Sequence, residues 1–268
     1  MRLDDVRGFV LDIDGTLVHR AGEEIHVQSG ASEVLARIRG SGRPLVLFTN
    51  GSHVPPETFA AGLRAAGLHV ADAEVLTPLC SVQSYLRGAR RSGPVLFIGT
   101  DAARAYLERR GVPLLDRDGD DAAAVFVAHP KSPDFEELEH AARTVLRGAR
   151  LLTGSYARAY AGADGPILSR GAMITAALAK ATGARPVVVG KPSRAAVRAI
   201  GEHLGVRTEE LAVVGDDLNM DVALGKLGGA RTVLVRSGIS SLVELEGVRE
   251  QRRPDVVVDS VAALLDRI

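Results

Sequence analysis

The stretch that decides the fold is residues 8–16, GFVLDIDGT, in which a short apolar run ends in two acids and a glycine. Similar β-branched, apolar runs recur at residues 44–49, 95–98, 123–128, 186–189, 211–214, 232–235 and 255–258. Ala-, Leu- and Arg-rich stretches typical of helices alternate with them, at residues 32–39, 56–66, 102–110, 134–147, 172–181, 194–204 and 261–268. Apolar strands that alternate with helices predict an α/β fold in which helices cover both faces of a parallel sheet.

The composition excludes several function classes. The chain has 268 residues, and Lys+Arg equal Asp+Glu at 33 each, so the formal net charge is zero. Such a chain lacks the positive field that supports sequence-independent nucleic-acid binding. Aromatic residues make up 4% of the chain and Trp is absent, which argues against base-stacking surfaces. We therefore expect no nucleic-acid partner.

Cysteine usage and the N-terminal residues point to one compartment. The single cysteine, Cys80, cannot form an internal disulfide, as is usual in reducing compartments, and its apolar surroundings indicate a small core residue. Residues 1–5 include two acids before any apolar run, unlike a signal peptide. No stretch reaches the roughly 18 apolar residues of a membrane span. We therefore expect a cytoplasmic protein with no membrane partner.

Chemically useful residues follow four of the predicted strands. Reactive groups of parallel sheets gather beyond the carboxyl ends of the strands. The candidates at these four points are, in chain order, Asp12 and Asp14; Thr49, Asn50 and Gly51; Lys191; and Asp216, Asp217 and Asp221. Several carboxylates placed together need a cation to offset their repulsion, and oxygen-rich sites suit Mg²⁺. A lysine, a hydroxyl and turn N–H groups are the donors that a phosphoryl group requires.

In this arrangement the sequence resembles the phosphatases of the haloacid dehalogenase (HAD) superfamily. Asp12 to Thr16 resemble motif I of that family, Thr49 with Asn50 motif II, Lys191 motif III, and residues 215–221 motif IV. The segment around Lys191, preceded by residues 170–172 and a helix, is similar to the NagD-like or para-nitrophenylphosphatase branch. The resemblance implies a Rossmann-like parallel-sheet core and Mg²⁺-dependent hydrolysis of a small-molecule phosphate monoester.

The resemblance also implies a role for each candidate. Asp12 would be the nucleophile that forms an aspartyl-phosphate, and Asp14 the general acid and base. The carboxylates of Asp12 and Asp216 and the backbone carbonyl of Asp14 would hold the metal ion. The phosphoryl oxygens would be bound by Thr49, by the backbone N–H groups of Asn50 and Gly51, and by Lys191. Asp221 and Asp217 would orient metal-bound water from outside the coordination sphere.

The domain organisation follows from the spacing of the motifs. About 140 residues separate motifs II and III, far more than one crossover connection needs. Their strand and helix patterns predict an independent α/β unit, which resembles the C2-type cap of this branch. We therefore expect a core formed by residues 1–91 and 187–268, with the cap at residues 92–186. In relatives such a cap roofs the active site and forms a homodimer contact.

Departures from the branch pattern limit what the resemblance says about substrate. Residues 153–156, residues 169–171 and Asp217 all differ from the usual residues of the branch. The physiological substrate and the oligomeric state therefore stay open. His53 follows motif II closely enough to approach the site, but we interpret it as a surface or structural histidine. The acidic run at residues 116–121 lacks the spacing of a calcium loop, and a solvated turn is expected there.

Two other function classes stay open. Receiver-type signalling proteins also combine paired acids, a phosphorylatable Asp, a Thr and a Lys in a parallel sheet, so a non-catalytic, phosphate-responsive binding protein is one alternative. Such a protein needs neither the acid at Asp14 nor a large roofing unit. A HAD-fold dehalogenase or phosphonatase is the other. Dehalogenases need no metal, so the acids of motif IV argue against a dehalogenase. Phosphonatases need a lysine from the cap, and nothing in this sequence singles one out.

Overall fold

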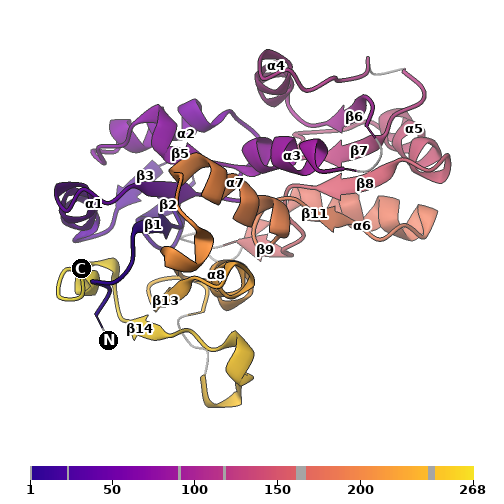
Figure 1. Ribbon diagram of the computed structural model, residues 1–268. Coiled ribbons are helices and arrows are strands. Elements are labelled where there is room, and N and C mark those ends of the chain that lie inside the picture. The colour runs from indigo at the N-terminus through magenta and orange to yellow at the C-terminus, as the bar shows by residue number, and fades with distance from the viewer. Residues whose placement is uncertain (1, 23, 90–91, 117–118, 161–166, 241–244) are drawn as a thin grey trace.

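The computed structural model describes all residues except 1, 23, 90–91, 117–118, 161–166 and 241–244. Two parallel sheets lie apart along the length of the molecule, and helices α3 and α7 run side by side between them (Figure 1). The predicted α/β architecture with a parallel-sheet core is therefore confirmed.

The larger sheet positions most of the candidate residues. Its strand order is β14 (Val256–Val258), β13 (Arg231–Val235), β12 (Leu211–Gly215), β1 (Gly8–Leu11), β4 (Leu45–Phe48) and β5 (Val75–Leu76), all parallel. Since β1 lies between β12 and β4, their carboxyl ends are neighbours. Side chains alternate across the sheet, so Phe9 and Leu11 pack in one apolar cluster and Val10 in another.

The smaller sheet has four parallel strands. Their order is β11 (Val187–Val188), β8 (Arg150–Thr153), β7 (Ala124–Val127) and β6 (Val95–Ile98). Val125 and Val127 pack with side chains from helices α5 and α6, while Phe126 packs on the opposite face. An apolar cluster therefore covers each face of this sheet, and the cluster around Phe126 includes side chains of α3 and α7.

Helices and two hairpins complete the structure. The helices are α1 (Ala31–Gly40), α2 (Pro56–Ala65), α3 (Pro78–Arg87), α4 (Asp101–Arg109), α5 (Phe135–Leu146), α6 (Arg170–Thr182), α7 (Arg194–Leu204) and α8 (Ala223–Gly228). The antiparallel hairpins are β2 (Val18–Ala21) with β3 (Glu24–Val27), and β9 (Ala159–Tyr160) with β10 (Ile167–Leu168). Both hairpins contribute side chains to the same cavity, described below.

Several elements differ from the sequence-based expectation, which contained neither hairpin, nor β5, nor α8. Helix α3 is an addition: Thr77 caps it by accepting a hydrogen bond from the Leu79 N–H, and Pro78 occupies its first turn. Cys80 lies on this helix, partly buried between two apolar clusters. The predicted C-terminal helix at residues 261–268 is wrong in type. Only a 3₁₀ turn forms, Val261–Leu264, because Val261 and Leu264 are buried three residues apart, which matches the tighter repeat.

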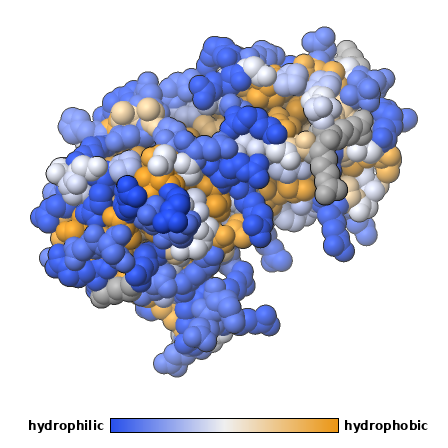
Figure 2. All heavy atoms as spheres, in the orientation of Figure 1, coloured by the Kyte–Doolittle hydropathy of each residue, from blue (hydrophilic) through white to orange (hydrophobic). Residues whose placement is uncertain are grey.

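Polar and charged side chains cover most of the face seen in Figure 2, with apolar patches between them. The two termini lie close together (Figure 1), and the Leu3 N–H donates a hydrogen bond of 2.8 Å to the Arg267 carbonyl. Within the described residues, none of the helices is long and apolar enough to span a membrane.

Candidate active site

The loop that follows β1 carries the first two candidate acids. Asp12 is buried, with 8% of its surface exposed, whereas Asp14 is partly open to solvent. The next residue, Gly15, has φ of +90°, and a Cβ there would lie 2.4 Å from Oδ2 of Asp216. Only glycine therefore lets this loop approach the Asp216 carboxylate.

Lys191 joins the acids of two loops. Its Nζ donates to Oδ1 of Asp12 at 2.5 Å and to Oδ1 of Asp221 at 2.6 Å, and all three side chains are buried. Burial by itself would lower the pKa of the ammonium, but the two carboxylates outweigh it and raise that pKa. The lysine is therefore a permanent cation at the centre of the site.

The loop after β12 supplies the remaining acids. Oδ2 of Asp216 accepts the Ile239 N–H at 2.7 Å, and Oδ2 of Asp221 accepts the Asp217 N–H at 3.1 Å. Burial, reinforced by the Asp221 carboxylate, raises the pKa of Asp216 to about 7. Burial and the same carboxylate also raise the pKa of Asp217. These acids carry more negative charge than the lysine alone offsets.

The acids are arranged to hold a cation. Asp12, Asp216 and Asp221 each offer an oxygen, and the three oxygens lie within 4.8 Å of one another. Oδ2 of Asp12 is buried and has no hydrogen-bond partner among the described residues. Burial raises the pKa of Asp12 well above its usual range, and Asp216 and Asp221 add to the effect. A buried carboxylate oxygen without a partner is costly, and a divalent cation would satisfy it.

The loop after β4 places Thr49, Asn50 and Gly51 beside this cluster. The Asn50 amide links the loop to Lys191: its Oδ1 accepts the Lys191 N–H at 2.7 Å, and its Nδ2 donates to the Lys191 carbonyl at 2.9 Å. Oγ1 of Thr49 accepts the Gly51 N–H at 3.0 Å. The Asn50 side chain therefore fixes the lysine backbone, and the Gly51 N–H is engaged within the loop.

Lys191 reaches the site by a different route from the one expected. The sequence predicts that the strand before Lys191 belongs to the same sheet as the strands before the other candidates, but β11 pairs with β8 in the smaller sheet. Val187 and Val188 thus lie on the far side of the boundary expected after residue 186. The chain then turns back, and Ser193 caps α7 by accepting the Ala196 N–H at 3.0 Å. The lysine therefore comes from the connection between the two sheets.

All nine candidate residues line one cavity of about 440 Å³ that lies between the two sheets. The lining residues absent from the sequence-based candidates include four with titratable side chains: Arg20 on β2, His53 after Asn50, His129 after β7 and Tyr160 on β9. His53, interpreted from sequence as a surface or structural histidine, faces this cavity.

Arg20 makes the firmest of the unforeseen contacts. Its Nε donates to Oδ1 of Asp14 at 2.5 Å, and both side chains are about three-quarters buried. The polar–apolar alternation on either side of Gly22 is a hairpin signal that could have located Arg20. The spacing between Arg20 and Asp14 carries no such signal, because the contact depends on where the hairpin folds.

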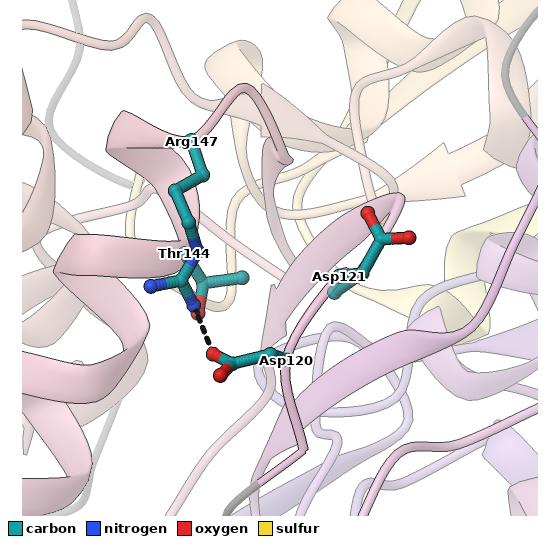
Figure 3. Close-up of a pocket in the computed structure, with 5 residues that line it drawn as sticks. Asp120, Asp121, Thr144 and Arg147 are labelled. Carbon is teal, nitrogen blue, oxygen red and sulfur yellow. Dashed lines mark hydrogen bonds and ion pairs between the residues drawn. The ribbon is translucent and has the colours of Figure 1, made fainter.

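The acidic run of the smaller sheet is remote from this cavity. Asp120 and Asp121 line a separate hollow with Thr144 and Arg147 (Figure 3). Nη2 of Arg147 donates to Oδ1 of Asp120 at 2.5 Å, so the acid forms an ion pair at the surface. Residues 117–118 of the same run lie outside the described residues.

Comparisons with known proteins agree with this geometry. Residues 9–113 match the family described as haloacid dehalogenase-like hydrolase, and residues 188–264 match a HAD-hydrolase-like family. The ribonucleotide monophosphatase NagD of Escherichia coli K12 is 30% identical over 263 residues, 97% of this chain and 98% of that protein. The dihydroxyacetone phosphatase of Corynebacterium glutamicum is 28% identical, and the match covers 96% of this chain and 90% of that protein. The solved structure of the p-nitrophenyl phosphatase of Archaeoglobus fulgidus matches with a TM-score of 0.84 and 30% identity. The match covers 98% of this chain and 100% of that protein.

Proposed function

The chain belongs to the haloacid dehalogenase-like hydrolases, and on this basis we propose that it is a Mg²⁺-dependent phosphatase acting on small-molecule phosphate monoesters. The observation that carries the proposal is the buried Asp12 carboxylate. Lys191 holds one of its oxygens, and the other has no partner among the described residues. Such a carboxylate is fixed in position for attack beside a site that fits a cation.

In the proposed reaction, an oxygen of Asp12 attacks the phosphorus, and the bond from phosphorus to the ester oxygen breaks. Asp14 gives its proton to the departing alkoxide. Water then attacks the phosphorus of the aspartyl-phosphate and loses a proton to Asp14, which releases inorganic phosphate and the Asp12 carboxylate. Lys191 and Thr49 lie where they can bind the phosphoryl oxygens.

We propose that residues 92–186 form the cap, and that residues following the strands of the smaller sheet form the roof of the cavity. His129, Ser155 and Tyr160 line the cavity from this side. The Thr100 hydroxyl, at the start of α4, donates to the His53 carbonyl at 2.5 Å, which ties the cap to the core loop. A roofed cavity of this kind supports a small ester as the substrate and disfavours a protein-sized one.

The metal is proposed to be Mg²⁺, held by Asp12 and Asp216, with Asp14 contributing its backbone carbonyl. When bound, the ion would offset the charge of nucleophile and phosphate together. The Asp221 carboxylate accepts from Lys191, and its closeness to Asp12 and Asp216 would place it beside a bound ion, where it would help to orient the groups around that ion. Asp217 accepts the Asn219 N–H at 2.6 Å and lines the cavity next to these acids.

Mg²⁺ is expected to raise the melting temperature more at about pH 8 than at about pH 5.5. The folded-state pKa of Asp216, about 7, exceeds its unfolded value of 3.8. Without metal, this group therefore lowers the free energy of unfolding as pH rises from about 4 to about 7, because the carboxyl ionises more readily in the unfolded chain. Above that range the ionised carboxylate is available to the ion. Thermal melts of the wild type and Asp216→Asn, with and without Mg²⁺, test this; an equal Mg²⁺ shift in both proteins would contradict the assignment.

Hydrolysis of p-nitrophenyl phosphate tests the proposed function. We expect turnover in the presence of Mg²⁺ and its loss in EDTA, restored by added Mg²⁺. Metal-dependent turnover would exclude the non-catalytic, phosphate-responsive alternative. Failure of the folded protein to hydrolyse either this ester or a panel of metabolite phosphates would argue against a phosphatase.

Replacement of Asp14 by Asn is expected to harm esters with poor leaving groups most. General acid catalysis typically contributes about 10²–10⁴-fold, and an alkoxide depends on it far more than p-nitrophenolate does. We expect a loss in that range with an alkyl phosphate and a clearly smaller one with p-nitrophenyl phosphate. The two kcat values measured on one preparation give the ratio. Equal losses on both esters would rule out Asp14 as the acid.

The quaternary structure and compartment are proposals too. Phe135, Leu168 and Met173 are exposed apolar side chains within residues 92–186, at 81%, 64% and 57% exposure, and they support a homodimer contact through the cap. Light scattering coupled to gel filtration would give the mass in solution. A single cysteine supports a reducing, cytoplasmic location.

A further inference from the structure

Two histidine rings from opposite sides meet in the cavity. His53 belongs to the loop after β4, and His129 follows β7 of the smaller sheet. Their ring centroids lie 5.7 Å apart at 58°, and the His53 ring also contacts the Phe59 ring edge-on at 5.2 Å. Both imidazoles line the cavity, and neither makes a hydrogen bond to any part of the chain that the structure describes. Their nitrogens are therefore available to a ligand.

These imidazoles are uncharged near neutral pH. Burial, helped by His129 and Arg20, lowers the pKa of His53 to about 4. Burial and the nearby Arg170 also lower the pKa of His129. Tyr160, which shares this part of the cavity, has its pKa raised by burial and by the Asp14 carboxylate, so its phenol keeps its proton. This side of the cavity thus offers neutral hydrogen-bond donors and acceptors.

Fixed charges around the cavity do not by themselves decide which alcohol is bound. The described lining residues include five aspartates, and the two lining cations, Arg20 and Lys191, are already paired with acids. Lys131 and Arg170, however, also act on the two histidines. Hydrogen bonds are therefore the basis for selection, and two neutral imidazoles offer them to hydroxyl groups.

We propose that His53 and His129 form the subsite for the leaving alcohol and select alcohols that carry further hydroxyl groups, of the polyol or sugar type, over alcohols that carry none. This inference rests on the proposed phosphatase function. The imidazole nitrogens would bind hydroxyl groups of the alcohol, one from the core and one from the cap. Selection would then require the cap and the core loop together, and the Thr100 contact to the His53 carbonyl holds them in register.

A matched pair of esters tests the role of the hydroxyl groups. Glycerol 3-phosphate and n-propyl phosphate share a three-carbon chain, and only the first carries free hydroxyl groups. For the wild type with Mg²⁺ we expect kcat/KM to be about 10-fold or more higher for glycerol 3-phosphate. Equal or higher values for n-propyl phosphate would overturn the proposal.

Variants test the two histidines. His53→Phe and His129→Phe keep a ring but remove the nitrogens, and each should lower the kcat/KM ratio of glycerol 3-phosphate to phenyl phosphate about 3- to 10-fold. The Gln variants at both positions keep neutral donors and acceptors and should recover most of this ratio. His203→Phe, an exposed position at the end of α7, is the matched control and should not move it.

The outcomes separate this proposal from the function on which it rests. An unchanged ratio in both Phe variants, with circular dichroism showing folded proteins, would refute the subsite while phenyl phosphate turnover upheld the phosphatase. Equal losses in the Phe and Gln variants would show that the rings act only as packing and would also refute it. Absence of turnover with all three esters would overturn the phosphatase and the subsite together.

Discussion

Replacement of Asp12 by Asn is expected to reduce kcat by at least about 10⁴-fold while the protein stays folded, because an amide cannot act as the nucleophile. The shape of the side chain is retained, and Lys191 keeps its contact to Asp221. Removing one charge also relieves the repulsion that Asp216 and Asp221 exert on this position. Steady-state kinetics with p-nitrophenyl phosphate, alongside a urea unfolding curve, measures both quantities.

The matched control is Asp120→Asn. Asp120 is exposed, lies in the separate hollow of Figure 3 and pairs there with Arg147. Losing a surface ion pair changes stability by about 1 kcal/mol or less, and this variant should retain wild-type turnover. If Asp12→Asn kept more than a few per cent of wild-type activity, a nucleophile other than Asp12 would be required. If both variants lost activity equally, the defect would lie in folding.

Replacement of Lys191 by Met is expected to destabilise the protein by about 3–5 kcal/mol as well as to impair turnover. The ammonium is buried between the carboxylates of Asp12 and Asp221, so its removal leaves two buried acids without their cation. The substitution also removes the ammonium that would bind the phosphate of the substrate. Urea unfolding at about pH 8, without metal, gives the size of the stability loss.

The pH dependence separates this charge effect from a packing defect. Burial already raises the pKa of Asp12 and that of Asp216, and loss of the lysine removes a cation that holds the pKa of Asp12 down. As pH falls these acids take up protons more readily than free carboxyl groups do, so the stability loss of Lys191→Met should be smaller at about pH 5.5 than at about pH 8. A loss that is independent of pH would contradict the assignment. Lys226→Met, which breaks a partly exposed pair with Asp255, should cost about 1 kcal/mol or less at either pH.

Several features of this protein could be predicted from short stretches of sequence. The apolar run at residues 8–11 forms a buried central strand because side chains on both of its faces are apolar. Once that strand is parallel to its neighbours, Asp12, Thr49 and Asp216 must meet, since the carboxyl ends of neighbouring parallel strands share one edge. The site acids and the hydroxyl were therefore accessible from local pattern and one rule of topology.

Other features depended on contacts between residues far apart in the chain. Two-residue strands such as β11 are too short to show which sheet they join, so the origin of Lys191 was not predictable. The Arg20–Asp14 pair depends on how the β2–β3 hairpin folds over the loop after β1. The helix α3 had a local signal in Thr77 and Pro78, but its place between the two sheets did not.

The sequence by itself determined which candidate residues could meet at the end of the larger sheet, because Asp12, Thr49 and Asp216 each follow an apolar run, which is a local signal. The tertiary structure alone decided the histidine pair of the cavity. His53 and His129 are separated by 75 intervening residues and meet only because the smaller sheet lies against the loop after β4. Their uncharged state likewise arises from burial and from neighbouring cations, which are properties of the packed molecule and not of the residue type.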